Sequence, residues 1–327
     1  MNYSRKFFRL LDNYVISRVS GRSSTAQFWY LPEPAIVDSA QSLRDLYSAP
    51  QPLYPMDYRA KLKFRTENEL GIIVLPYESP TGPQINPEAA FQFALGLHDT
   101  WVRTQNTGDL NRFLKYANYF VERQTPDGLW TYAFDWHGSK APWSSALAQS
   151  RGASVMLRAW LQSGDPVYRD ATRRALEKFS VTLQAGGFLH VFERESCPYF
   201  EEYPGTPTGV INGFMSSLIS LWDVNFYLKD NMLNALWQEG IVSLEKMLPH
   251  YTNGWWSLYD LDDDSPILNV NSPRYHLLEL NYLKVLQQMS GSDVLSGQYE
   301  NRRLQYKNWM SWAKALGLKT LRKVLYR

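Results

Sequence analysis

One repeated unit constrains the fold of this chain more than any other feature. Two predicted helices lead into a glycine turn and a short aromatic strand, and this unit occurs three times. The turns are at 126–128, 186–187 and 253–254. A pair of helices cannot bury its apolar face alone, so consecutive pairs must pack side by side.

Apolar residues at helical spacing predict four such helical pairs. The helices are expected at about 86–102, 109–124, 145–163, 166–184, 210–228, 231–248, 273–289 and 293–315. The first begins at Asn86-Pro87-Glu88, a typical helix start. The fold class is therefore mainly α, and four pairs that close on themselves give an α/α toroid over residues 85–327. An open helical solenoid would have the same repeat.

The first 84 residues are predicted to form a separate N-terminal part. Residues 3–19 have the pattern of an amphipathic helix, and residues 20–57 are rich in Ser, Pro and Tyr, which is typical of an irregular arm. Residues 58–65 alternate apolar and basic side chains, and 71–75 are apolar. This pattern predicts a β-hairpin with a basic face.

The basic face of this predicted hairpin has two interpretations. It is either an ordinary solvent-exposed face or the contact surface of an anionic partner, which would relieve the repulsion between like charges. Lys61 and Lys63 are the candidates for that contact.

Composition places the chain among soluble globular proteins. It has 327 residues, of which 44% are hydrophobic and 20% charged, and a net charge of +2. No apolar run approaches the ~18 residues of a membrane span, and charged residues interrupt the start, so a cytoplasmic protein is predicted. The single cysteine, Cys197, excludes an intrachain disulfide. The many Trp and Tyr residues are also typical of carbohydrate-binding clefts.

The C-terminal stretch, 301–327, has eight Lys or Arg residues and no acidic residue. Trp309, Trp312 and several leucines are interleaved with them. The pattern fits either an amphipathic helix that contacts anionic lipid or a final packed helix with a basic solvent face.

The most unusual stretch chemically runs from Tyr199 to Pro204. Glu201 and Glu202 are adjacent there and lie between aromatic residues. The proline favours an extended chain, in which neighbouring side chains point to opposite faces, so one glutamate is expected to be structural. A carboxylate packed among tyrosines can have the shifted pKa of a catalytic base. The alternative is a solvated, aromatic-rich loop.

Several classes of chemistry lack their motifs. The five histidines have no metal-binding spacing, and there is no GxSxG, P-loop or Rossmann fingerprint. What remains are Tyr, Glu, His and Arg residues near turns, in 200–204, 257–261 and 274–276. Two of these clusters lie at the ends of the repeated pairs, so they are expected to converge at the toroid mouth.

Five motifs, spread over about residues 85–310, together resemble the D-glucuronyl C5-epimerases of heparin and heparan sulfate biosynthesis. They are Trp143 to Gln149, Glu201 to Phe214, Leu248 to Tyr251, Ser257 to Leu261, and Tyr275-His276 with Asn281. The resemblance implies an isomerase that inverts C5 of D-glucuronate to L-iduronate within a heparosan-like polysaccharide. Such an enzyme removes the proton α to the carboxylate and returns one from the opposite ring face, with no redox cofactor or obligatory metal.

The resemblance also implies roles for individual residues. Glu202 and Tyr275 are the expected opposed acid/base pair, and Tyr203 and Tyr259 the expected proton relays or donors to the intermediate. Substrate-binding residues are expected at Trp143, Gln149, Arg151, Glu201, Asn212, Arg274 and His276. The expected partner is an anionic polysaccharide and not a nucleic acid. A homodimer is expected if the N-terminal arm reaches a neighbour's cleft.

Three positions depart from the family pattern. Asp262 occupies the place of a carboxylate-binding arginine, for which Arg274 or Arg151 are candidate replacements. Glu279 replaces a histidine, and Ser216 replaces a tyrosine. These departures bear on substrate details more than on the reaction type. The alternatives are a polysaccharide lyase or glycoside hydrolase on the same scaffold, or a non-catalytic binder of anionic glycans.

Overall fold

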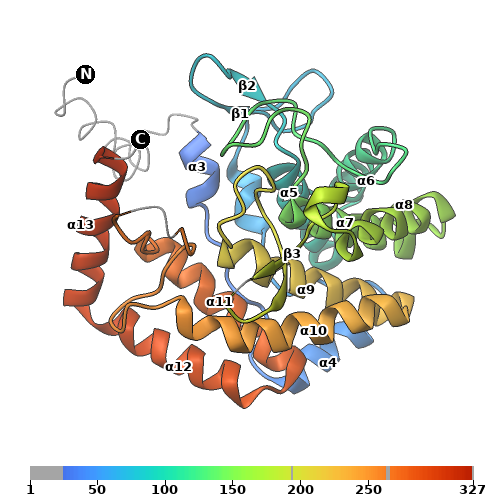
Figure 1. Ribbon diagram of the computed structural model, residues 1–327. Helices are drawn as coiled ribbons and strands as arrows, with labels where there is room; N and C mark the ends of the chain where they lie inside the picture. The colour runs from blue at the N-terminus through green and yellow to red at the C-terminus, as the bar shows by residue number, and fades with distance from the viewer. Residues whose placement is uncertain (1–24, 193, 263–265, 326–327) are drawn as a thin grey trace.

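The computed structural model describes residues 25–192, 194–262 and 266–325, and its fold is mainly helical (Figure 1). The amphipathic helix predicted at 3–19 lies outside these residues. The paired helices are α5 (Pro87–Thr104) and α6 (Thr107–Val121), α7 (Ala146–Ser163) and α8 (Pro166–Glu177), α9 (Ile211–Leu228) and α10 (Asn231–Met247), and α11 (Pro273–Ser290) and α12 (Asp293–Lys307). The predicted helical pairs are confirmed.

Helices α5, α7, α9 and α11 form the inner layer, each packed against the next, and the second helix of each pair covers them from outside. Side-chain caps define where several of them begin; Asn86, for example, accepts a hydrogen bond from the amide of Ala89 at the start of α5. Since each outer helix returns antiparallel to its partner, the inner helices run in one direction. Their N-termini lie at the same end of the molecule.

The N-terminal segment closes this arc into a ring. It contains α3 (Thr25–Tyr30), α4 (Ala40–Ser48) and the 3₁₀ helix η2 (Arg59–Lys63). Arg274 of α11 donates to the carbonyl oxygens of Tyr30 and Leu31, both at 2.6 Å. At its other end the segment packs on α5 so closely that a Cβ on Gly96 would lie 2.6 Å from the carbonyl oxygen of Tyr58. The α/α toroid is therefore confirmed, and residues 25–64 complete it.

The same segment fills one end of the toroid. The Tyr47 hydroxyl donates to Asp223 at 2.6 Å, and the Tyr54 hydroxyl is 2.8 Å from that of Ser220. Arg158 binds Asp223 at 2.8 Å and the carbonyl of Leu53 at 3.1 Å. These partners are in the C-terminal halves of α7 and α9. The N-terminal end of the inner helices is consequently the end where loops can build a site.

The prediction of a strand at 58–65 is wrong. These residues form η2, and Lys61 is fully buried there. Its amine donates to Glu33 at 2.6 Å and to the carbonyl of Phe28 at 3.1 Å. This buried ion pair holds Lys61 away from solvent, so the predicted basic face does not form. The strand pairing that is present is short and comes in two places: Glu67 forms an isolated bridge with Ile73, and β1 (Leu75–Pro76) pairs antiparallel with β2 (Pro83–Gln84).

The remaining elements are short or lie near the C-terminus. They are η3 (Lys178–Ser180), η4 (Leu183–Ala185), β3 (Leu189–Phe192), β4 (Cys197–Phe200), η5 (Leu248–His250) and α13 (Trp309–Leu325). Strands β3 and β4 form an antiparallel hairpin after the second glycine turn. The other two predicted aromatic strands are isolated bridges: Tyr132 to Trp143 in the first, and Thr252 to Ser257 and Leu258 to Val270 in the second.

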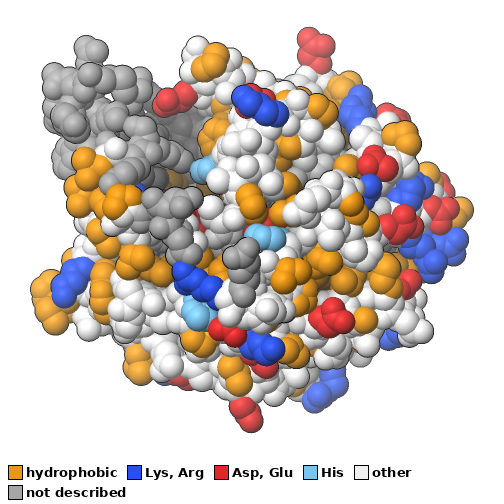
Figure 2. Space-filling view, in the orientation of Figure 1, with side chains coloured by type: hydrophobic (Ala, Val, Ile, Leu, Met, Phe, Trp, Pro, Cys, Tyr) orange, Lys and Arg blue, Asp and Glu red, His pale blue; other side chains and the backbone are white. Residues whose placement is uncertain are grey.

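The last predicted helix, 293–315, is two helices, because the chain is extended at Asn308. Helix α13 packs through the buried Ala315. It also exposes apolar side chains, which gather at the left edge of the molecule where Figure 1 shows α13 (Figure 2). In the described residues, none of the helices combines the length and apolar character that a membrane crossing requires. Contact of this segment with lipid stays a prediction.

Candidate active site

Glu202 lies where β4 ends and the first turns of α7 and α9 meet. The carbonyl oxygen of Glu201 accepts from the amide of Ala146, the first residue of α7, at 3.2 Å. Glu202 itself packs against Gly213 in the first turn of α9 and is 8% exposed. The carboxylate thus lies at the open, N-terminal end of the inner helices.

The two adjacent glutamates point in different directions. Glu201 is buried, and its Oε1 lies within hydrogen-bond distance of Nδ1 of His190 on β3, at 2.9 Å. Glu202 is hydrogen-bonded to the side chain of Tyr203. The structure therefore assigns Glu201 a partner in the β3–β4 hairpin and leaves Glu202 with the tyrosines, while the substrate contact of Glu201 stays a prediction.

Three tyrosines from different loops and helices surround Glu202. Tyr203 follows it directly, Tyr259 comes from the loop before α11, and Tyr275 is in the first turn of α11. The rings of Tyr259 and Tyr275 are 5.4 Å apart, edge to face. Tyr259 is also hydrogen-bonded to Tyr203. The structure thus brings together Glu202 and all three tyrosines that the sequence predicted.

Burial controls the protonation of this cluster. It raises the pKa of Glu202 to about 7, against the effects of the hydrogen bond from Tyr203 and the charge of Arg151. Burial, and then the negative charge of Glu202, raise the pKa of Tyr203 and of Tyr259 well above the usual value. At neutral pH the site therefore holds a carboxylate able to exchange a proton and two protonated phenols able to donate one.

This raised pKa makes the stability of the fold fall as pH rises. The unfolded carboxyl titrates near 4.5 and the folded one near 7, so the folded protein retains a proton that the unfolded chain has released. The contribution of Glu202 is complete below about pH 4.5 and is lost as pH rises through about 7, a change on the order of 3 kcal/mol.

We therefore expect Glu202→Gln to stabilise the fold at pH 8 and to have little effect at pH 4.5. The measurement is urea unfolding of the variant and the wild type across this range. Glu239→Gln, on the exposed face of α10, is the matched control and should leave the profile unchanged. If the free energies of unfolding of wild type and Glu202→Gln changed with pH in parallel, burial would not raise the pKa of this carboxyl.

An aromatic wall lies beside Tyr203. Trp143 stacks on Tyr132 with ring centroids 4.1 Å apart and is 6.0 Å from the Tyr203 ring. The ring of His137, which is an exposed residue, is 4.7 Å from the ring of Tyr203. Sequence reasoning found Trp143 but missed His137, whose position depends on a loop held by the bond from Thr206 Oγ1 to its carbonyl, at 2.7 Å.

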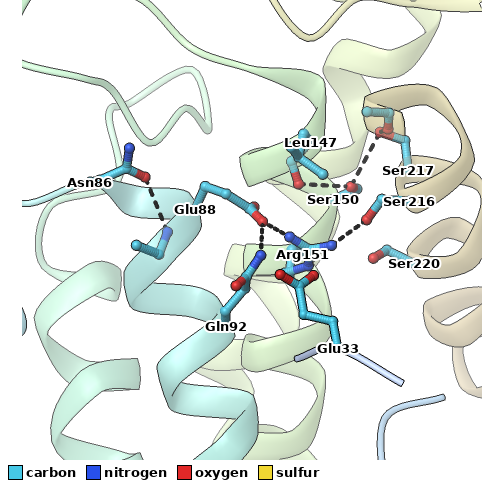
Figure 3. Close-up of polar contacts among 12 residues, drawn as sticks. Glu33, Asn86, Glu88, Gln92, Leu147, Ser150, Arg151, Ser216, Ser217 and Ser220 are labelled. Atoms are coloured by element: carbon cyan, nitrogen blue, oxygen red, sulfur yellow. Dashed lines mark hydrogen bonds and ion pairs between the residues drawn. The ribbon is translucent and has the colours of Figure 1, made fainter. Parts of the chain in front are cut away.

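Three predicted substrate-binding residues are instead fully buried. Gln149 binds the amide of Trp130, at 3.1 Å, and His276 contacts the Ser257 hydroxyl at 2.8 Å. Arg151 forms an ion pair with Glu88 and donates to Ser216, at the interface of α5, α7 and α9 (Figure 3). No part of these side chains reaches solvent, so the contacts that they make here are packing contacts, and their substrate contacts stay predictions.

The other predicted cations are not gathered at the site. Arg274 and Lys61 both form ion pairs with Glu33, which lies in the N-terminal segment. Lys63 is exposed at the end of η2. Asn212, by contrast, is in the first turn of α9 beside Gly213; it is 5% exposed, and neither atom of its amide bonds to a described residue.

The three departures from the family pattern each have a basic partner. Asp262 pairs with Arg322 of α13, at 2.9 Å. Glu279 forms a buried ion pair with Arg302 of α12, and Ser216 accepts from Arg151. Each replacement is thus part of the packing of this chain. Among the described residues, no cluster of three His, Cys, Asp or Glu side chains is placed to hold a metal ion.

The match to known families agrees with this geometry. A family described as D-glucuronyl C5-epimerase C-terminus matches residues 124–304, which contain Glu202 and the three tyrosines. The chain belongs to this family. A D-glucuronyl C5-epimerase of Caenorhabditis elegans is 29% identical over 205 residues, which are 56% of this chain and 33% of that protein.

An uncharacterized protein of Methanocaldococcus jannaschii is 31% identical over 139 residues, 40% of this chain and 44% of that protein. The chain thus spans less than half of the length of either relative. Among solved structures, an unsaturated glucuronyl hydrolase from Bacillus sp. GL1 gives a TM-score of 0.45 at 15% identity, over 70% of this chain and 61% of that one. A family 105 glycoside hydrolase from C. acetobutylicum gives a TM-score of 0.48 at 10% identity, over 67% of this chain and 62% of that one.

Gly213 determines how closely α9 approaches Glu202. A Cβ added at Gly213 would lie 2.6 Å from Oε2 and 2.8 Å from Cβ of Glu202, so either α9 or the Glu202 side chain must move. Since a displacement of about 1 Å can cost about 10²-fold in rate, we expect Gly213→Ala to lower turnover by this order. The measurement is the rate of C5 exchange described below.

Gly297 offers a matched control in α12, because nothing lies within 4 Å of a Cβ added there. Gly297→Ala should keep the rate and stabilise the fold by about 1 kcal/mol, the usual gain for a helix interior. Wild-type exchange by Gly213→Ala would mean that the position of Glu202 is not critical.

Proposed function

We propose that this protein is a uronate C5-epimerase that converts D-glucuronate to L-iduronate within a polysaccharide of heparosan type. The observation that carries the proposal is Glu202, a buried carboxyl with a pKa of about 7 that is in contact with Tyr203 and electrostatically coupled to Tyr259. The family match supports the same reaction class.

In the proposed reaction, Glu202 removes the C5 proton and the C5–H bond breaks. The electron pair enters the adjacent carboxylate, which becomes an enolate-like dianion stabilised by hydrogen-bond donors. Tyr275 then donates a proton to C5 from the opposite ring face. Tyr203 and Tyr259 donate hydrogen bonds to the intermediate and return the proton from Glu202 to Tyr275, so that the enzyme ends the cycle unchanged.

Two features of the site support a sugar substrate. The amide of Asn212 is buried without a described protein partner, whereas buried polar groups are normally hydrogen-bonded, so a sugar hydroxyl is a fitting partner. The wall of Trp143 and Tyr132 lies beside Tyr203 and offers aromatic rings for stacking on a sugar. A two-carboxylate hydrolase site at this motif is disfavoured, because Glu201 is engaged by His190.

The test is incubation with heparosan in D₂O, followed by NMR of the ring protons. Deuterium at C5 together with iduronate signals would support the epimerase. Exchange accompanied by chain cleavage and an unsaturated product would indicate a lyase. Polymer binding without any exchange would indicate a glycan-binding protein, and the proposal would then be abandoned.

A further inference from the structure

The final helix, α13, lies beyond the last residue of the family match, yet it reaches the candidate site. From the contacts of this helix we infer that Lys319 binds the carboxylate of the uronate substrate next to Tyr259. The inference deepens the proposed function and rests on it, because a uronate is the substrate in question. No other part of α13 is assigned to the site.

Lys319 is held in position over a site residue. Its Nζ lies 4.8 Å from the centroid of the Tyr259 ring and donates to Oδ1 of Asn269 at 2.6 Å. The carbonyl of Asn269 accepts from the backbone amide of Tyr259 at 2.7 Å. One residue thus fixes both the tyrosine and the cation, and the side chain of Lys319 is only partly buried.

The neighbouring Arg322 anchors the helix to the same loop. It binds Asp262 at 2.9 Å and also the carbonyl of Ile267. Because Lys319 and Arg322 are three positions apart, they lie on one face of α13, which faces the loop that carries Tyr259. Arg322 is therefore a positioning residue, whereas Lys319 is the cation that adjoins the tyrosine.

A uronate site requires a cation, since the charge on the carboxylate increases as C5 loses its proton. Arg151 is fully buried against Glu88, and Arg274 binds backbone carbonyls of the N-terminal segment. The loop position that follows Tyr259-Asp260-Leu261 is an acid, Asp262. Lys319 supplies positive charge at this loop from a distant part of the chain.

Two variants and one chemical probe test this inference. We expect Lys319→Gln to weaken binding of heparosan about 10- to 100-fold, as expected for loss of a charge-assisted bond, and to lower C5 exchange. Lys319→Arg should retain most of both. Lys314→Gln, on the exposed face of the same helix, is the control and should bind as the wild type does.

The probe is heparosan whose uronate carboxyls have been reduced to alcohols. Wild type and Lys319→Gln should bind it equally, because the charge that Lys319 contacts is gone. If Lys319→Gln lost affinity equally for heparosan and for the reduced polymer, Lys319 would be assigned to loop packing. Undiminished heparosan binding by Lys319→Gln would also overturn the inference. Absence of C5 exchange in the wild type would defeat the proposed function alone, because the binding comparison can still be made.

Discussion

Replacing Glu202 by glutamine is expected to lower C5 exchange by about 10²- to 10⁴-fold, the usual contribution of a positioned general base. Glutamine is nearly isosteric, but it cannot accept a proton at neutral pH. Its amide can still accept the hydrogen bond from Tyr203 that Glu202 receives. We therefore expect heparosan affinity to remain within a few-fold of wild type while exchange is lost.

Glu201→Gln is the matched comparison, because it makes the same change at the adjacent residue. Glu201 is buried against His190 and not hydrogen-bonded to Tyr203, so exchange should stay within about tenfold of wild type. The measurement is single-turnover deuterium incorporation with both variants. If Glu201→Gln lost exchange and Glu202→Gln kept it, the assignment of the base would be reversed.

The helical pairs could be predicted because their signals are local. Apolar periodicity, capping residues such as Asn86 and the glycine turns each act within a few residues of the chain. At Gly128, the backbone φ of +87° and a carbonyl that a Cβ would meet at 2.4 Å explain why glycine is required. Local rules therefore predicted the helical pairs and most helix starts, but not the ends of α8 and α12 or the segment that closes the ring.

The errors come from contacts between distant residues. The alternation at 58–65 predicted a strand, but the amine of Lys61 finds a buried partner in Glu33, 28 positions earlier. No local pattern distinguishes a basic residue that faces solvent from one with such a partner. Arg274 was expected at the substrate for the same reason, and its carbonyl partners are 243 and 244 positions away.

The candidate site shows the same division. Glu202, Tyr203, Tyr259 and Tyr275 were predicted through the resemblance of whole motifs, which carries information on distant neighbours. Lys319 lies outside these motifs, and its approach to Tyr259 depends on how α13 folds back on the loop. The three departures followed the same rule, since each acquired a basic partner that only the fold brings near.

Removal of Arg151 is expected to have the largest effect on stability. The guanidinium is fully buried, forms an ion pair with Glu88 of α5 and donates to Ser216 of α9 (Figure 3). It also donates to the Tyr282 hydroxyl of α11, at 3.2 Å. It therefore joins all four inner helices, since Arg151 itself is in α7. Arg151→Met leaves Glu88 charged and buried with only the hydrogen bond from Gln92, at 2.8 Å, and we expect a loss of about 3–5 kcal/mol in the free energy of unfolding.

A second substitution separates two contributions to the lost stability: the unpaired, buried carboxylate of Glu88 and the lost packing of Arg151. Glu88→Gln in the Arg151→Met background removes the unpaired charge and should recover a large part of the loss, because the pair itself is offset by desolvation. Arg112→Met is the matched control: its ion pair with Glu67 is similarly direct, at 2.6 Å, but partly exposed, so a loss below about 1 kcal/mol is expected. Denaturant unfolding of the four proteins gives these differences.

The same variants connect the toroid core to the chemistry. The charge of Arg151 lowers the pKa of Glu202, opposing the effect of burial. In Arg151→Met this opposition is lost, so the pKa of Glu202 should rise further and the pH at which exchange reaches half its maximum should rise with it. An unchanged pH profile in a folded Arg151→Met protein would restrict Arg151 to stability, whereas an upward shift would show that the buried cation also sets the protonation of the base.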